Sequence, residues 1–86
     1  MKDSARDRIV DAARAWIKLM PGGLVFRSQD VQRQVLGTEV VACQARGTTR
    51  LGKPRFRADV SAAIRWMVSK GFVRKLGGKW QRTGVD

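Results

Sequence analysis

The stretch RADVSAAIRWMVSKGFVRKLGGKWQRT, residues 57–83, decides the fold. Residues 57–70 carry apolar side chains at helical spacing and predict one buried helix face, made of Val60, Ala63, Ile64, Met67 and Val68. Gly71 stands where a glycine commonly ends a helix. Residues 72–76 and 79–83 flank Gly77-Gly78, which is a tight-turn signal, so the second part of the stretch predicts a β-hairpin.

The hairpin can form in two registers. A two-residue turn pairs Leu76 with Lys79, whereas a three-residue turn pairs Leu76 with Trp80. The second register places two apolar side chains on one face of the hairpin, and we therefore expect it.

Upstream, residues 4–20 predict an amphipathic helix. Ser4 is placed to cap it, and Pro21-Gly22-Gly23 ends it. Its apolar stripe consists of Ile9, Ala13, Trp16, Ile17 and Met20. The acids Asp3, Asp7 and Asp11 lie on the other side, where we expect a solvated face with local ion pairs rather than a metal or acid–base site.

Residues 24–56 contain shorter elements. Residues 24–26 predict a short strand or an extended connector, and Ser28 is placed to cap a helix that ends at Gly37. Residues 39–46 suit a short helix capped by Thr38, although the Val40-Val41 pair would equally suit a strand. Residues 47–56 contain turn residues and a proline, and we expect an exposed loop.

The order of these elements, and the segment VSAAIRWMVSKGFV at residues 60–73 in particular, resembles the winged helix-turn-helix superfamily. The resemblance covers about residues 5–83 and implies one α+β domain, residues 1–86, that is mainly α with a small β component. It implies three core helices and a C-terminal hairpin that serves as the wing. The chain departs from the family pattern through a long basic insertion at about residues 38–56, before the third core helix.

Charge is the main functional signal. The formal net charge is +11, and the last 41 residues hold eleven of the 18 Lys and Arg residues but only Asp59 and Asp86 as acids. Because so much like charge repels itself in a small domain, a polyanionic partner is favoured. Arg is twice as frequent as Lys, and its planar fork suits phosphate and guanine edges.

The winged-helix resemblance implies that helix 57–70 enters the major groove of duplex DNA, with the wing at 72–83 on the backbone or minor groove. We predict that the side chains facing the bases are Arg57, Ser61, Ala62 and Arg65. We predict phosphate contacts at Arg46, Arg50, Lys53, Arg55 and Lys70. On the wing, the predicted contacts are Arg74, Lys75, Lys79 and Arg82.

Several of these residues also have structural interpretations. The basic cluster at residues 46–57 is otherwise a solvated loop, and Arg65 otherwise lies over Trp66 or pairs with Asp59. Trp16 and Trp80 are expected to pack in the core or against the hairpin rather than to stack on unpaired bases.

The composition argues against catalysis. Histidine is absent and Cys43 is the single cysteine, so neither a zinc site nor a Cys–His pair is available, and we expect no enzyme activity, metal or cofactor. The chain has no long apolar run and no apolar segment near its start, so we expect a cytoplasmic protein without a membrane span or secretory signal.

The expected role is that of a repressor, or of an accessory factor in recombination or replication, encoded by a phage or another mobile element. Two alternatives remain open: a protein-binding module that docks on an acidic surface of host machinery such as RNA polymerase or a nuclease, and RNA binding. We expect a monomer, or a weak homodimer formed through exposed residues such as Val40, Val41 and Leu51.

Overall fold

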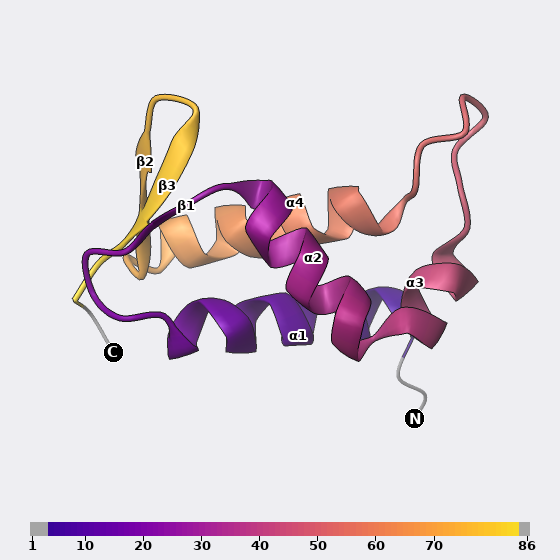
Figure 1. Ribbon diagram of the computed structural model, residues 1–86, viewed down its shortest axis with the longest axis horizontal. Helices are drawn as coiled ribbons and strands as arrows, with labels where there is room; N and C mark the ends of the chain where they lie inside the picture. The colour runs from indigo at the N-terminus through magenta and orange to yellow at the C-terminus, as the bar shows by residue number, and fades with distance from the viewer. Residues whose placement is uncertain (1–3, 85–86) are drawn as a thin grey trace.

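The computed structural model describes residues 4–84, in which four helices and a three-stranded antiparallel sheet form an α+β fold (Figure 1). The elements in chain order are α1 (Ala5–Leu19), β1 (Val25–Phe26), α2 (Ser28–Thr38), α3 (Val40–Arg46), α4 (Phe56–Ser69), β2 (Val73–Leu76) and β3 (Lys79–Arg82). Within residues 4–84, no helix combines the length and the apolar character needed to cross a bilayer.

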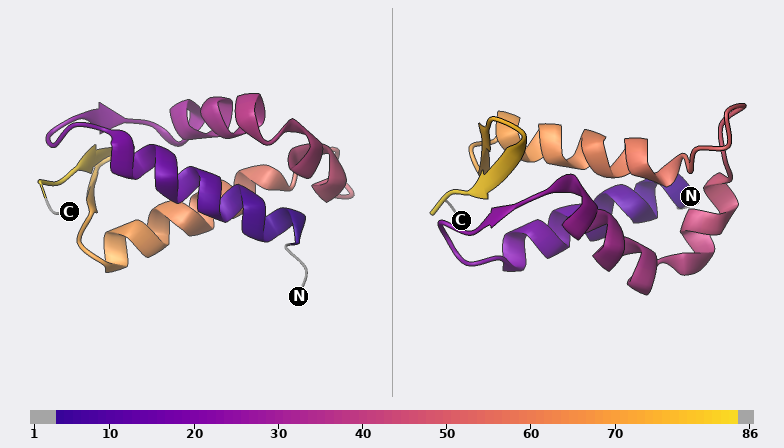
Figure 2. Two further views of the ribbon diagram at one scale, coloured as in Figure 1. Left: turned by 90° about the horizontal axis from the view of Figure 1, so that it is seen from below. Right: turned by 45° about the horizontal axis from the view of Figure 1, so that its top comes forward.

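The core lies where α1, α2 and α4 meet. Helices α1 and α4 run side by side, and α2 packs against both (Figure 2). The predicted stripes of α1 and α4 supply most of the side chains that are fully buried, including Ile9, Ile17, Val60, Ile64 and Met67. Val68 is an exception to the prediction: it is 36% exposed, because it lies on the outward side of α4.

The ends of α1 and α2 follow local hydrogen bonding. Ser4 caps α1 as predicted, since its Oγ accepts a bond from the backbone N of Asp7 at 3.1 Å. Ser28, in contrast, is already inside α2, and Asp30 Oδ2 accepts from the backbone N of Arg27 at 2.9 Å. The prediction that Gly37 ends α2 is wrong: the helix continues through Thr38, whose Oγ1 donates to the carbonyl of Gln34 at 3.2 Å.

The sheet order is β1–β3–β2, with β3 in the centre. Leu76 pairs with Lys79 across a two-residue turn, and Gly77 has a φ of 58°, so the three-residue turn predicted above is wrong. In the observed register, Trp80 and Arg82 lie on the face of β3 that meets the core. A slip of one residue would have turned both toward solvent.

The segment expected to be a basic insertion loop is largely ordered. Residues 40–46 form α3, as the helical interpretation predicted, and bury Ala42 and Cys43. The expected cap is wrong: Thr38 belongs to α2, and Glu39 is the residue that precedes α3. Residues 47–55, which we call the basic loop, fold back on themselves. Thr48 forms an isolated antiparallel β-bridge with Pro54, and the N–H of Thr49 donates to the carbonyl of Lys53 at 2.8 Å. The Arg55 N–H donates to the Gly47 carbonyl at 3.0 Å and closes the base of this loop.

Candidate nucleic-acid interface

Two projections frame the exposed side of α4. The C-terminal hairpin, residues 73–82, rises near the end of α4, and the basic loop rises near its start, both toward the same side of the molecule (Figure 1). The same arrangement is visible when the top of the molecule is turned forward (Figure 2). We call this surface the saddle: the side of α4 turned away from α1, together with the basic loop and the C-terminal hairpin.

The floor of the saddle is positive. Arg57 and Arg65 are exposed on α4, and Ser61 is half-buried between them. Within the described chain, Arg65 neither lies over the Trp66 ring nor pairs with Asp59. The cations over Trp66 are Arg14 and Lys70, and Asp59 pairs with Arg46 and Arg6. The only acid of α4 is therefore removed from the saddle, since Asp59 is 3% exposed.

The two projections carry further cations. Five of the predicted backbone contacts are exposed on them, namely Arg50, Lys53, Arg55, Lys75 and Lys79. Residues 60–84 contain no Asp or Glu. An anion that approaches the saddle therefore meets cations on three sides and no opposing carboxylate from α4 or the hairpin.

The α2 side of the saddle contains residues that sequence reasoning missed. A hollow between α2 and α4 is lined by Gln29, Gln32, Arg33, Leu36, Phe56 and Arg57. A second hollow, between the start of α2 and the hairpin tip, is lined by Arg27, Ser28, Gln29, Leu76, Gly78 and Lys79. The sequence held one signal for this surface: the polar residues of α2 lie on the side opposite its buried Val31 and Val35.

Arg82 was predicted on the wing surface, and the structure contradicts this. It is 3% exposed, and its Nε donates to the Ile17 carbonyl at 3.0 Å. Its Nη1 donates to the carbonyls of Phe72 and Thr83 at 3.2 and 2.8 Å. Arg82 thus joins the C-terminal end of α1 to the hairpin, where a cation also suits the helix dipole.

Arg46 was predicted to contact phosphate, but its guanidinium is bound within the protein. Its Nε and Nη2 donate to Asp59 Oδ2 and Oδ1 at 2.7 and 3.2 Å, and its side chain is only 29% exposed. The second oxygen of this carboxylate also lies 3.7 Å from Arg6 Nε. Arg46 therefore anchors the end of α3 to α4, next to the base of the basic loop.

Ala62 and Lys70 lie on the flank of α4 that faces α1, outside the saddle. Ala62 lines a hollow together with Trp66 and residues of α1, so the prediction that it shares a face with Arg57 is wrong. Lys70 Nζ lies 5.7 Å from the centroid of the Trp66 ring, and the guanidinium carbon of Arg14 lies 3.9 Å from the same centroid. The Trp66 ring therefore makes cation–π contacts with two side chains of the protein itself.

Arg74 and the two tryptophans Trp16 and Trp80 are held by contacts within the protein. Arg74 is exposed, and its Nε donates to Gln81 Oε1 at 2.8 Å across the hairpin. Trp16 and Trp80 both pack against the core, as expected, and Trp80 Nε1 donates to Ser28 Oγ at 3.3 Å. The latter bond fixes the hairpin against the start of α2.

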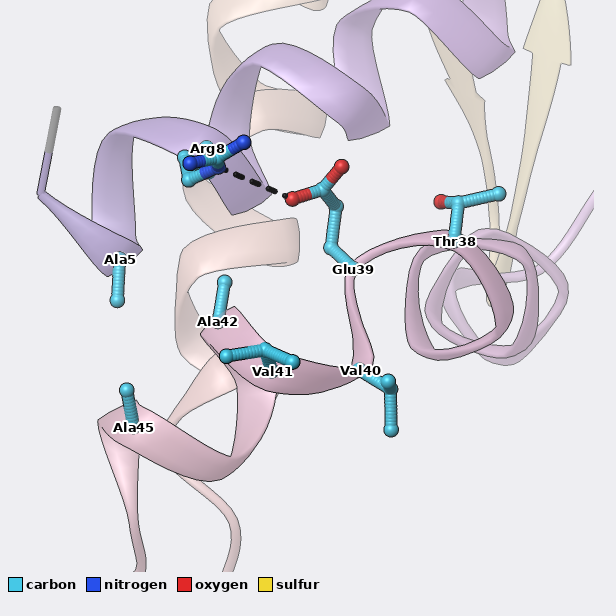
Figure 3. Close-up of a pocket in the computed structure, with 8 residues that line it drawn as sticks. All are labelled: Ala5, Arg8, Thr38, Glu39, Val40, Val41, Ala42 and Ala45. Carbon is cyan, nitrogen blue, oxygen red and sulfur yellow. Dashed lines mark hydrogen bonds and ion pairs between the residues drawn. The ribbon is translucent and has the colours of Figure 1, made fainter.

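A separate hollow lies between α3 and the start of α1, away from the saddle (Figure 3). Small apolar side chains form most of its wall, including Ala5, Val41 and Ala45. Its two charged residues point toward each other, and Arg8 Nε donates to Glu39 Oε1 at 3.3 Å (Figure 3). The charges of the pair offset each other, so this hollow has little electrostatic attraction for an anion.

Cys43 lies on the buried side of α3 and is 5% exposed. Burial raises the pKa of its thiol, and the carboxylates of Glu39 and Asp59 act in the same direction. The thiol is therefore kept in its neutral form and behaves as a small packed hydrophobe.

Comparison of the chain with protein-family models, curated proteins and solved structures gives no match.

Proposed function

We propose that this protein is a small winged helix-turn-helix protein that binds duplex DNA and reads its sequence through α4. The observation that carries the proposal is the saddle, in which α4, with its exposed Arg57 and Arg65, runs between two projecting basic segments (Figure 1). An element order of helix, strand, helix and helix before a terminal hairpin, with α3 inserted, also supports it.

The dimensions of the saddle suit a duplex. Helix α4 has 14 residues, or about 21 Å at the usual rise, and an α-helix fits the major groove. The longest axis of the molecule is 35 Å, close to the length of roughly one turn of DNA. A duplex lying on α4 therefore meets the C-terminal hairpin, acting as the wing, at one end and the basic loop at the other.

The proposed division of labour follows from chemistry. Arg57 and Arg65, with Ser61 between them, take the positions that face base edges, where an Arg fork is suited to guanine. Arg50, Lys53 and Lys79 lie on the projections and contact phosphates, which supply affinity without sequence information. The exposed Arg33, beside Arg57 in the α2 hollow, joins the same surface.

A binding titration tests the proposal. Labelled duplex DNA, duplex RNA and single-stranded DNA are titrated with the full chain at salt concentrations of about 50 to 300 mM. We expect duplex DNA to bind most tightly, with an affinity that falls steeply as salt rises. A preference for duplex RNA would favour the RNA alternative. No binding to any nucleic acid at low salt would contradict both and favour an acidic protein partner.

A further inference from the structure

An exposed leucine stands at the tip of the basic loop. Leu51 is 83% exposed, more than any other large apolar side chain among residues 4–84. Exposure of this extent means that Leu51 contributes almost nothing to the core. The side chain is therefore available to a partner that offers an apolar environment.

The loop holds Leu51 in a defined position. The Gly52 N–H donates to the Thr49 carbonyl at 2.9 Å, which makes Arg50 and Leu51 the two central residues of a tight turn. Gly52 has a φ of 82°, a conformation that suits glycine, and the Lys53 N–H donates to Thr49 Oγ1 at 3.2 Å. The apolar side chain thus stands at the outermost point of an ordered projection.

The charges around Leu51 indicate what it meets. Arg50 precedes it and Lys53 follows it by two residues, and no acid lies between residues 40 and 58. Cations on either side of an apolar tip would bring phosphates to both sides of that tip. An apolar side chain held between two phosphate chains faces the stacked bases, and leucine is among the residues that wedge between base steps from the minor groove.

The other projection provides a comparison within the same molecule. Leu76 stands next to the turn of the C-terminal hairpin and precedes glycine, as Leu51 does. Leu76, however, is only 37% exposed and lines a hollow together with Arg27, Ser28 and Gln29 of the α2 region. Only the basic loop therefore offers a fully free apolar tip.

We propose that the protein bends DNA, with Leu51 inserted as a wedge between base pairs of the minor groove next to the segment bound by α4. This inference rests on the proposed duplex-DNA binding and adds a second activity to it. Unstacking one step kinks the duplex, and the bend brings more phosphates toward the basic loop.

Ligase-mediated circularisation of short DNA tests the bend without knowledge of the target site. Fragments of about 110 bp, shorter than the persistence length of about 150 bp, close into circles slowly because they are stiff. We expect the wild-type protein to raise the rate of circle formation about tenfold. A tenfold increase corresponds to a bending free energy lowered by roughly 1.4 kcal/mol. Leu51→Ala should lose most of this gain, whereas Leu51→Met, which keeps a large apolar side chain, should retain it.

The matched control is Leu19→Ala. Leu19 is 75% exposed on α1, away from the saddle, and this change should leave circle formation at the wild-type level. Binding of a straight duplex by each variant is measured in parallel. If wild type binds duplex DNA without promoting circles, or if Leu51→Ala promotes them fully, the wedge is overturned while DNA binding stands. If wild type binds no duplex, both proposals fail.

Discussion

Arg46 and Asp59 form a two-point ion pair, with Nε–Oδ2 and Nη2–Oδ1 distances of 2.7 and 3.2 Å, that joins the end of α3 to the buried side of α4. Arg46 directly precedes the basic loop and Asp59 follows it on α4, so the pair holds the two ends of that loop together. A residue expected to bind phosphate thus serves to position those that can.

Replacing Asp59 by Asn should therefore affect both stability and the basic loop. We expect Asp59→Asn to lower the free energy of unfolding by about 2 kcal/mol, because Arg46 loses its charged partner in a half-buried setting. Urea denaturation measures this loss, and limited trypsin digestion should cut faster after Arg50 and Arg55 of the basic loop. Asp11→Asn, at an exposed position of α1, is the control and should stay within about 0.5 kcal/mol of wild type.

Arg82 should behave as a structural residue rather than as a binding residue. Arg82→Met leaves the carbonyls of Ile17, Phe72 and Thr83 without its guanidinium, so we expect a loss of about 2–3 kcal/mol in urea unfolding. Lys79→Met, three residues earlier on the same strand but exposed, should cost at most about 0.5 kcal/mol. Equal stability of the two variants would contradict the role given to Arg82.

Variants of the saddle should separate base contacts from phosphate contacts. Arg65→Ala should reduce the preference for the best duplex, selected from a random pool, by about 1–3 kcal/mol relative to a scrambled duplex. Lys79→Ala should weaken both duplexes equally and reduce the slope of log K against log salt by about 1. Identical behaviour of the two variants would show that α4 and the hairpin do not divide the work in this way.

The raised pKa of the Cys43 thiol has a consequence for stability. The folded protein disfavours the thiolate, so the contribution of Cys43 is fully present below the unfolded pKa of about 8.5 and is lost as pH rises through the folded pKa. The stability difference between wild type and Cys43→Ala should therefore be smaller at pH 10 than at pH 7.5, in urea unfolding at each pH. A difference that stays constant or widens would contradict burial of the neutral thiol.

Helices α1, α2 and α4 were predictable because each of them buries a face with a clear period, whereas the seven residues of α3 would equally have suited a strand. Ile9, Ala13 and Ile17 of α1, like Val60 and Ile64 of α4, recur at intervals that only a helix places on one side. The hairpin was also predictable as an element, but not in register. Choosing between the two turns required the contact of Trp80 with Ser28, which lies 52 residues away in the chain.

The candidate site was predicted in outline and missed in particular residues. Asp59 stands three residues after Phe56 and four before Ala63, so it shares their buried face, but this signal was hidden while Phe56 was assigned to a loop. The burial and the hydrogen bonds of Arg46 and Arg82 depend on partners that lie far away in the sequence, which a local pattern does not reveal. The contribution of α2 depended likewise on its packing beside α4.

The central claim is that binding depends on where the cations lie and not on net charge alone. It is tested most directly by the salt dependence of duplex-DNA affinity for two double variants of equal charge, Arg50→Gln with Lys79→Gln and Arg8→Gln with Lys18→Gln. The first pair lies on the two projections of the saddle, and the second lies on α1. We predict that the saddle variant lowers the slope of log K against log salt by about 2, since two phosphate contacts are lost, while the α1 variant keeps the wild-type slope. Equal losses from both variants would contradict the account.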